Sequence, residues 1–284
     1  FITVPREIVE LVTTGNVQRP AFSTDFPAKR IETRLDWDDL VLDPHTMERV
    51  LEIKTWVEYG EALLNDPDLR KKLKPGYRAL FFGPSGTGKT LTASLLGKVA
   101  DLDVYRIDLS MVVSKYIGET EKNLEKVFRK AENKRWVLFF DEADALFGKR
   151  TDIRDAHDRY ANQEVSYLLQ RVDDYEGIVI LASNLRSNLD EAFTRRFQSI
   201  VYFPMPGRGE RQSLWERGFS SRLRPDPAVD LSEIAAAYEL SGGAIMNVVR
   251  YATLMTLKRG RQAISGDDII DGIRKELQKE GRTS

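Results

Sequence analysis

The sequence of 284 residues predicts an α/β fold, a doubly wound parallel five-stranded sheet followed by a small all-helical lid domain. The main observation is that short apolar runs alternate with segments of helical periodicity between about residues 79 and 203. A second observation is that strand-like runs stop after Pro204-Met205-Pro206-Gly207, while helical spacing continues. We therefore predict a linker or the end of an upstream domain at 1–34, an α/β domain at 35–206 and the lid domain at 207–284.

The first expected element is a helix at 44–64, because apolar residues recur there at helical spacing before Pro67. Five short apolar runs then predict buried strands, at 79–82, 104–107, 136–140, 178–182 and 199–203. Helical segments separate them. Between the second and third strands, for example, the apolar positions with helical spacing are Leu124, Val127, Phe128 and Ala131. Strands that are apolar throughout and alternate with helices predict a parallel sheet covered on both faces.

Composition places the chain among ordinary globular proteins, with 42% hydrophobic and 31% charged residues. The formal net charge is −1, so no overall basic field points to a nucleic acid as a partner. The absence of cysteine excludes disulfides and thiolate chemistry and fits a cytoplasmic protein. No apolar run has the length of a membrane span. The chain starts at Phe1 without a methionine or a signal-peptide pattern, which predicts a fragment of a longer protein or a trimmed one.

The segment Gly83-Pro84-Ser85-Gly86-Thr87-Gly88-Lys89-Thr90 fits the pattern G-x-x-x-x-G-K-[ST] and lies between an expected strand and an expected helix. Its glycines allow main-chain N–H groups to surround phosphate oxygens, and the following helix adds its positive N-terminal end. Lys89 is expected to reach the β- and γ-phosphates of ATP, the Thr90 hydroxyl to bind Mg²⁺, and Leu91 to lie beside the nucleotide. The alternative is a glycine-rich turn with an exposed lysine.

Two carboxylates follow the strand expected at 136–140, at the edge where open α/β sheets bind ligands. Asp141 is expected to hold hydrated Mg²⁺, and Glu142 to orient or deprotonate the attacking water. The alternative is an acidic pair that only caps the next helix. Asn184 follows the strand at 178–182, from where its amide could reach the γ-phosphate or the water, although asparagine also ends strands for turn-forming reasons.

Taken together, GPSGTGKT, LFFDEAD, the Asn184 of LASN, and LDEAFTRRF at 189–197 resemble the motifs of the AAA+ ATPases. The resemblance covers about residues 35–281. Within the superfamily the chain looks like the AAA group proper, which includes FtsH, katanin and spastin, and like bacterial stand-alone members of that group. The stretch SKYIGETEKNLEKVF and the sequence RRF followed by YFPMP carry this closer likeness. The resemblance implies a P-loop NTPase fold, ATP hydrolysis, and ATP and Mg²⁺ as cofactors.

The resemblance also implies contacts between copies of the chain. It makes Asn184 the sensor asparagine, and Arg195 and Arg196 arginine fingers that act on ATP held by a neighbouring subunit. Fingers supplied across an interface imply a ring, here an ATP-promoted homohexamer. The stretch Asp173-Asp174-Tyr175 resembles the family's intersubunit signalling segment, usually Asp-Gly-Phe, from which Asp174 departs.

Two further sites are implied by the same resemblance. A central pore loop whose aromatic residue grips polypeptide is matched by Lys115, Tyr116 and Ile117. The adenine is expected between two segments, Asp39, Leu40 and Val41 on one side and Gly242, Gly243 and Ala244 on the other.

The function predicted on these grounds is a ring-shaped ATPase that converts hydrolysis into pulling on a polypeptide substrate or adaptor. The alternatives are a nucleic-acid motor or loader, a metabolic kinase, and an ATP-gated assembly factor of a larger complex such as a contractile injection system. A kinase needs an acceptor pocket and a nucleic-acid motor needs a basic or aromatic lining, and the sequence signals neither.

Overall fold

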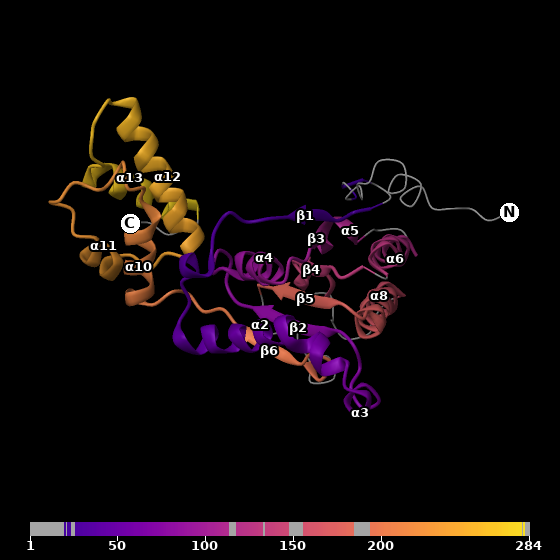
Figure 1. Ribbon diagram of the computed structural model, residues 1–284. Helices are drawn as coiled ribbons and strands as arrows, with labels where there is room; N and C mark the ends of the chain where they lie inside the picture. The colour runs from indigo at the N-terminus through magenta and orange to yellow at the C-terminus, as the bar shows by residue number, and fades with distance from the viewer. Residues whose placement is uncertain are drawn as a thin grey trace, which may run out of the picture.

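The computed structural model describes residues 20, 22–23, 26–113, 118–132, 134–147, 156–184, 194–279 and 281, apart from the side chains of 146–147 and 156–162. These residues form two lobes (Figure 1). The larger lobe contains a six-stranded sheet with helices on both faces, and the smaller lobe consists of helices.

The sheet has the strand order β1-β3-β4-β5-β2-β6. Its strands are β1 Lys29–Ile31, β2 Tyr77–Phe82, β3 Val104–Asp108, β4 Val137–Asp141, β5 Ile178–Ser183 and β6 Ser199–Tyr202. All paired strands run parallel except β1, which is antiparallel to β3. Every residue of β2 and β5 is buried, which explains the almost continuous apolar sequence of these strands. The predicted fold class, α/β with a parallel sheet, is therefore confirmed for the strands β2 to β6, and β1 departs from it by its antiparallel direction.

The predicted number of five strands is wrong by one, because β1 adds a sixth strand at the edge of the sheet. A short edge strand joins a sheet through main-chain hydrogen bonds and needs no apolar pattern, so an apolar run in the sequence cannot identify it. The side chains of β1 are exposed or half-buried, and Arg30 forms an ion pair with Asp103 at 2.7 Å. Before β1, Phe26 is fully buried, with its ring centre 5.3 Å from that of Tyr105. Part of the segment expected to be a linker thus belongs to the core of the larger lobe.

Helices cover both faces of the sheet. The helices α2 Pro44–Leu64 and α4 Lys89–Val99 pack on one face, and α6 Glu119–Ala131 and α8 Ala156–Asp174 pack on the other. A short helical turn, η1 Trp37–Asp39, precedes α2. Further short helices lie between the long ones, α3 Pro67–Arg70, α5 Leu109–Val112 and α7 Asp144–Phe147. The start of α2 matches the prediction, since Asp43 Oδ1 accepts hydrogen bonds from the N–H groups of His45 and Thr46, and Pro44 opens the helix.

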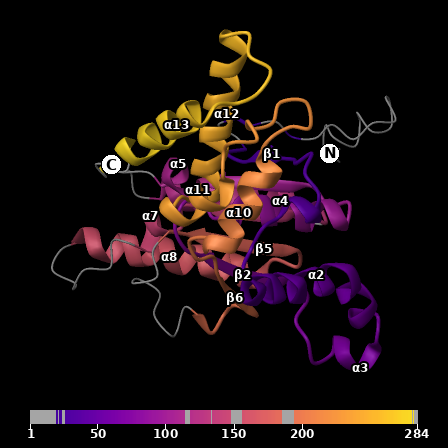
Figure 2. The ribbon, with the colours of Figure 1, turned by 90° about the vertical axis from the view of Figure 1, so that its left-hand side faces the viewer.

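The smaller lobe, here called the lid, is formed by α10 Arg208–Gly218, α11 Leu231–Ala237, α12 Gly242–Lys258 and α13 Gly266–Lys279. It has its own core, which includes the fully buried Trp215, Ile245 and Val248. Figures 1 and 2 show that the lid lies beyond the carboxyl ends of the parallel strands. A site at that edge of the sheet is therefore bounded by both lobes.

Arg78 in β2 is a charged residue with only 3% exposure. Its guanidinium donates hydrogen bonds to the main-chain carbonyl oxygens of Pro75, Gly76, Val172, Asp173 and Tyr175. Some of these belong to the last turn of α8, where carbonyl groups have no partner within the helix. Burial lowers the pKa of the Arg78 guanidinium, while nearby carboxylates act in the opposite direction. Arg78 thus fixes the end of α8 to the start of β2, at the edge of the sheet away from the lid.

An Arg78→Met variant is expected to lose roughly 3 kcal/mol of unfolding free energy, because buried carbonyl groups lose their donors. Urea denaturation measures this loss. Arg222→Met, which removes an exposed arginine of the lid, is the matched control and should change the free energy by less than about 0.5 kcal/mol. Equal stabilities of the two variants would show that the Arg78 contacts contribute nothing.

Candidate active site

A glycine-rich loop at 83–88 connects β2 to α4 at the carboxyl edge of the sheet. The φ angles of Gly83, Gly86 and Gly88 are 142°, 75° and 105°, a region that residues with a side chain rarely adopt. At Gly83 a Cβ atom would overlap the carbonyl oxygen of Phe203, just after β6. Gly88 directly precedes α4, so the N-terminal N–H groups of that helix face the loop. The open backbone and the helix N-terminus together form a cradle suited to phosphate groups.

Lys89, the first residue of α4, is 7% exposed and turns back toward the loop. Its Nζ donates to the carbonyl oxygens of Gly83 at 2.6 Å and Pro84 at 2.8 Å, and to Asn184 Oδ1 at 3.1 Å. Burial lowers the pKa of the Lys89 ammonium group, while nearby carboxylates act in the opposite direction. The structure thus brings Lys89 and Asn184, which lie far apart in the sequence, into direct contact.

The acidic pair lies at the end of β4, beside the loop. The side chain of Asp141 is 16% exposed and forms an ion pair with Arg106 of β3, with 2.9 Å between Oδ2 and Nε. Asp141 Oδ1 accepts a hydrogen bond from the N–H of Glu142 at 3.0 Å. The φ angle of Glu142 is 55°, and this left-handed conformation costs a residue with a side chain about 1 kcal/mol. Strained backbone of this kind is concentrated at functional sites, where the surrounding contacts hold it in place.

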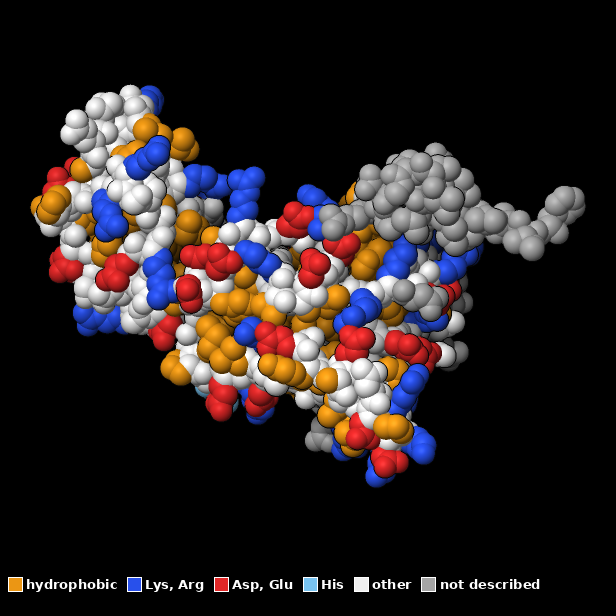
Figure 3. Space-filling model, viewed as in Figure 1, with side chains coloured by type: hydrophobic (Ala, Val, Ile, Leu, Met, Phe, Trp, Pro, Cys, Tyr) orange, Lys and Arg blue, Asp and Glu red, His pale blue; other side chains and the backbone are white. Residues whose placement is uncertain are grey.

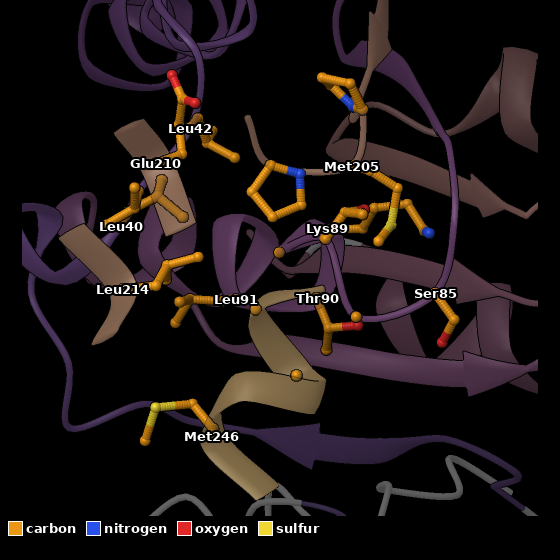
Figure 4. A pocket seen from close by; sticks show the side chains of 18 of the residues that line it. Leu40, Leu42, Ser85, Lys89, Thr90, Leu91, Met205, Glu210, Leu214 and Met246 are labelled. Carbon is orange, nitrogen blue, oxygen red and sulfur yellow. The ribbon is translucent and has the colours of Figure 1, made fainter. Parts of the chain in front are cut away.

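These residues line a pocket of about 560 Å³ between the sheet and the lid. Pockets of about 300–1,000 Å³ accommodate a small organic ligand. Figure 4 shows apolar side chains, among them Leu40, Leu91 and Leu214, on one side of the pocket, with Lys89 and Thr90 on the other. An apolar slot beside a phosphate cradle fits a nucleotide, with the base in the slot and the phosphates on the loop.

The lid meets the phosphate loop directly. The N–H of Gly243, at the start of α12, donates to the carbonyl oxygen of Gly86 at 3.0 Å. A Cβ atom on Gly86 would lie 2.6 Å from Ser241 Oγ, so this contact has no room for a larger residue. Arg217 of α10 adds a second contact, because its guanidinium donates to the carbonyl oxygen of Asp38. The shape of the pocket therefore depends on both lobes.

The structure gathers most of the predicted site residues in this pocket. Its walls include Asp39, Leu40, Val41, Ser85, Gly86, Thr87, Gly88, Lys89, Thr90, Leu91, Asp141, Glu142, Asn184, Gly242 and Gly243. Gly83 and Pro84 contribute through the carbonyl groups that hold Lys89. Ala244 is not one of the lining residues, and its N–H donates to Ser241 Oγ at 3.2 Å. The predicted pore residues Lys115, Tyr116 and Ile117 lie outside the described residues.

The predicted fingers Arg195 and Arg196 are exposed and are not part of the pocket wall. Arg196 forms an ion pair with Asp173 in the last turn of α8. The next polar residue, Gln198, is bound to the main chain of Arg78 by its side chain at 2.8 Å and by its own N–H at 3.0 Å. The segment that carries the two arginines is thus attached to the amino ends of the strands, beside the end of α8.

Several pocket residues were not predicted from the sequence. Among them are Leu42, Arg106, Met205, Leu214, Arg217 and Met246. Leu214 and Met246 belong to the lid, and nothing in their sequence positions connects them with the phosphate loop. Arg106 could have been found, because an arginine that interrupts an apolar strand needs a partner, and the carboxylate of Asp141 ends the next strand along the chain.

The oxygen atoms of the pocket suit Mg²⁺ that is held jointly with a nucleotide. Within the described ranges, no group of three or more His, Asp or Glu side chains is arranged to bind a metal by itself. Mg²⁺ at nucleotide sites usually takes only one or two protein ligands, and water and phosphate oxygens complete its shell. The Thr90 hydroxyl and the Asp141 carboxylate, both in the pocket wall, are ligands of this kind.

Known proteins resemble this chain over most of its length. Residues 79–205 match the model of the ATPase family associated with various cellular activities (AAA). A proteasome-activating nucleotidase of Aeropyrum pernix is 34% identical over 223 residues, which are 75% of this chain and 54% of that protein. A cell division cycle protein 48 homolog of Archaeoglobus fulgidus is 30% identical over 273 residues, 90% of this chain and 36% of that protein. The peroxisomal ATPase PEX6 of Komagataella pastoris is 29% identical over 282 residues, 95% and 23% respectively.

In this sheet β2 leads into a phosphate cradle, and the acidic pair at the end of β4 lies beside the cradle. This arrangement defines a P-loop nucleotide hydrolase. The match to the AAA family model narrows this class of protein to one family. The chain belongs to the AAA+ ATPases, and it binds and hydrolyses ATP. Its closer likeness to FtsH, katanin and spastin stays a prediction.

The chain spans about half or less of the length of these relatives. In the part of the chain that the structure describes, no helix combines the length and the apolar character of a membrane span.

Proposed function

We propose that copies of this chain form an ATP-promoted homohexameric ring that remodels, unfolds or disassembles protein substrates through a central pore. The observation that carries the proposal is the position of Arg195 and Arg196, which are exposed and lie outside the pocket of their own chain. If these arginines act on ATP, that ATP is held by another copy. Contacts of this head-to-tail kind close into a ring when the rotation between copies closes.

A protein substrate is favoured by two observations. On the face seen in Figure 3, acidic and basic side chains are interspersed, whereas a nucleic-acid groove needs a concentration of basic side chains. One relative is named as a proteasome-activating nucleotidase, so its name connects that protein with the proteasome. We therefore propose a polypeptide, or an adaptor that delivers one, as the partner of the ring.

In the proposed mechanism the adenine occupies the apolar slot lined by Leu40, Leu91 and Leu214, and the phosphates lie on the loop at 83–88. Lys89 exchanges the loop carbonyls for oxygens of the β- and γ-phosphates, which bind an ammonium group more strongly because they are charged. Bound Mg²⁺ would neutralise phosphate charge, and Thr90 and Asp141 are the residues that would hold it.

Hydrolysis needs a water in line with the bond that breaks. Glu142, next to Asp141 in the pocket wall, orients this water or accepts its proton. Asn184, already in contact with Lys89, holds the γ-phosphate or the water from the adjacent strand. Arg195 and Arg196 of the neighbouring copy stabilise charge that develops on the transferred phosphoryl group. The products are ADP and phosphate.

The residues Lys115, Tyr116 and Ile117 are proposed to line the pore. A tyrosine ring offers a large contact area with little loss of side-chain entropy and grips chains of any sequence.

A Tyr116→Ala variant is expected to keep its ATPase rate. It should unfold a fluorescent protein with an unstructured tail at least about fivefold more slowly, because a single aromatic contact is worth about 1 kcal/mol or more. Loss of fluorescence with time measures unfolding, and phosphate release measures the ATPase. The matched control is Tyr59→Ala on α2, where the tyrosine is 64% exposed. Unchanged unfolding by Tyr116→Ala would exclude this pore loop, and stimulation by added DNA or RNA would favour a nucleic-acid motor.

A further inference from the structure

The last carboxylate of the segment LFFDEAD, Asp144, has no role in the function proposed above. It is the first residue of α7, on the same segment as Asp141 and Glu142. Unlike those two residues, it is not part of the pocket wall. Because Asp144 follows two pocket residues in the sequence but does not line the pocket, direct contact with the nucleotide or its metal is not expected.

The carboxylate of Asp144 continues the pairing of β5 where β4 ends. The ladder between these strands is followed by one more main-chain bond, from the N–H of Ala143 to the carbonyl oxygen of Ala182 at 2.9 Å. Beyond it, Asp144 Oδ1 accepts a hydrogen bond from the N–H of Asn184 at 3.2 Å. The same oxygen accepts a second bond from Ser183 Oγ at 3.4 Å. A side chain thus replaces the strand that no longer runs alongside β5.

The end of β5 is therefore held from both sides. On the opposite side, the carbonyl oxygen of Ser183 accepts a hydrogen bond from the N–H of Gly83 in the phosphate loop, at 3.2 Å. Between these attachments, the side chain of Asn184 reaches Lys89, with 3.1 Å between Oδ1 and Nζ. Hydrogen bonds to an ionised carboxylate are about twice as strong as neutral ones. The bond from Asp144 is thus well suited to fix the main chain from which the Asn184 amide projects.

We propose that Asp144 is a positioning residue for ATP hydrolysis, which fixes the main chain at Asn184 so that the Asn184 amide stays beside Lys89 and the γ-phosphate position. This inference rests on the role proposed above for Asn184. Asp144 acts through Asn184 and touches neither the nucleotide nor Mg²⁺.

The test compares Asp144→Ala and Asp144→Asn in the full chain, each with and without Asn184→Ala. Asp144→Ala is expected to lower kcat about tenfold while the KM for ATP changes less than about twofold, because the positioning affects the reaction and not binding. Asp144→Asn keeps an acceptor oxygen and should stay within about threefold of the unmodified kcat. In the Asn184→Ala background neither substitution should lower kcat further, since no amide is left to position.

Asp230→Ala is the matched control for the loss of a carboxylate with two donors. In the lid, Asp230 Oδ1 accepts hydrogen bonds from the N–H groups of Ser232 and Glu233 at 2.8 and 3.1 Å. This variant should lower the melting temperature and leave kcat unchanged. If Asp144→Ala lowers kcat by the same factor with and without Asn184, the inference is overturned. A rise in the Mg²⁺ concentration needed for the half-maximal rate would overturn it as well, because it would make Asp144 part of the metal site.

The failure of the inference and the failure of the proposed function give different results. If Asn184→Ala alone hydrolyses ATP at the full rate, the role proposed for Asn184 is wrong and the inference fails with it. If Asn184→Ala is slow and both Asp144 variants are fast, only the inference fails. Should Asp144→Ala not fold, Asp144→Glu takes its place in the test, because it keeps the charge but displaces the oxygen that accepts the two hydrogen bonds. This variant should lower kcat only when Asn184 is present.

Discussion

A Glu142→Gln variant is expected to bind ATP as tightly as the unmodified chain and to hydrolyse it at least about a hundredfold more slowly. The amide keeps the size of the carboxylate, so the pocket wall and the left-handed backbone at this position are preserved. What is lost is the ability to accept a proton from the attacking water. Equilibrium binding of a fluorescent ATP analogue and phosphate release under saturating ATP measure the two properties separately.

The matched control is Glu176→Gln, which makes the same change at an exposed position in the turn before β5. It should leave both binding and turnover unchanged. Normal turnover by Glu142→Gln would contradict the role proposed for this carboxylate and leave the acidic pair as a helix cap.

Removal of the two exposed arginines is expected to have the second large effect. Arg195→Ala combined with Arg196→Ala should lower kcat about a thousandfold, because arginine fingers contribute factors of about 10³–10⁵. ATP binding should be unchanged, since neither arginine lines the pocket of its own chain. Arg196 is paired with Asp173 in the same chain, so the melting temperature of the double variant is measured alongside its kcat.

Mixing experiments decide whether these arginines act between copies. In a random equal mixture of the double arginine variant with Glu142→Gln, about a quarter of the pockets combine an intact Glu142 with an arginine pair from the neighbour, so about a quarter of the unmodified rate should return. The control replaces the exposed Arg222 and Arg224 of the lid by alanine and should keep the full rate. A mixture as inactive as its components would exclude action in trans, as would a Glu142→Gln protein that stays monomeric with ATP.

The strands that could be predicted from the sequence are those that are buried, because burial requires apolar residues. The runs at 104–107 and 178–182 fall within β3 and β5, because both faces of these strands are covered. The start of β2 was placed too late, at residue 79, since a charged residue at position 78 contradicts a buried strand. The structure resolves this contradiction, because carbonyl groups from the loop before β2 and from the end of α8 satisfy the Arg78 guanidinium.

The site was predictable where its functional residues lie close together in the sequence. The phosphate loop and the acidic pair are local patterns, and the structure places both at one edge of the sheet. The apolar slot is different, because it combines Leu40, which precedes the loop, with Leu214 of the lid, and only the tertiary fold brings them together. The sequence also did not predict the contacts of Asp144, the last carboxylate of LFFDEAD, because its hydrogen bonds to the end of β5 depend on how the chain turns after β4.

The hydrogen bond between the Gly243 N–H and the Gly86 carbonyl oxygen favours the lid position seen here over a displaced lid. A single main-chain hydrogen bond contributes about 1 kcal/mol, which corresponds to a preference of about fivefold for the lid position seen here. A nucleotide that contacts both lobes adds to that preference, and linkage makes the effect reciprocal, so whatever displaces the lid weakens nucleotide binding by the same factor. In the proposed ring, a neighbouring copy that displaces the lid of one subunit would therefore lower the ATP affinity of the pocket in that subunit.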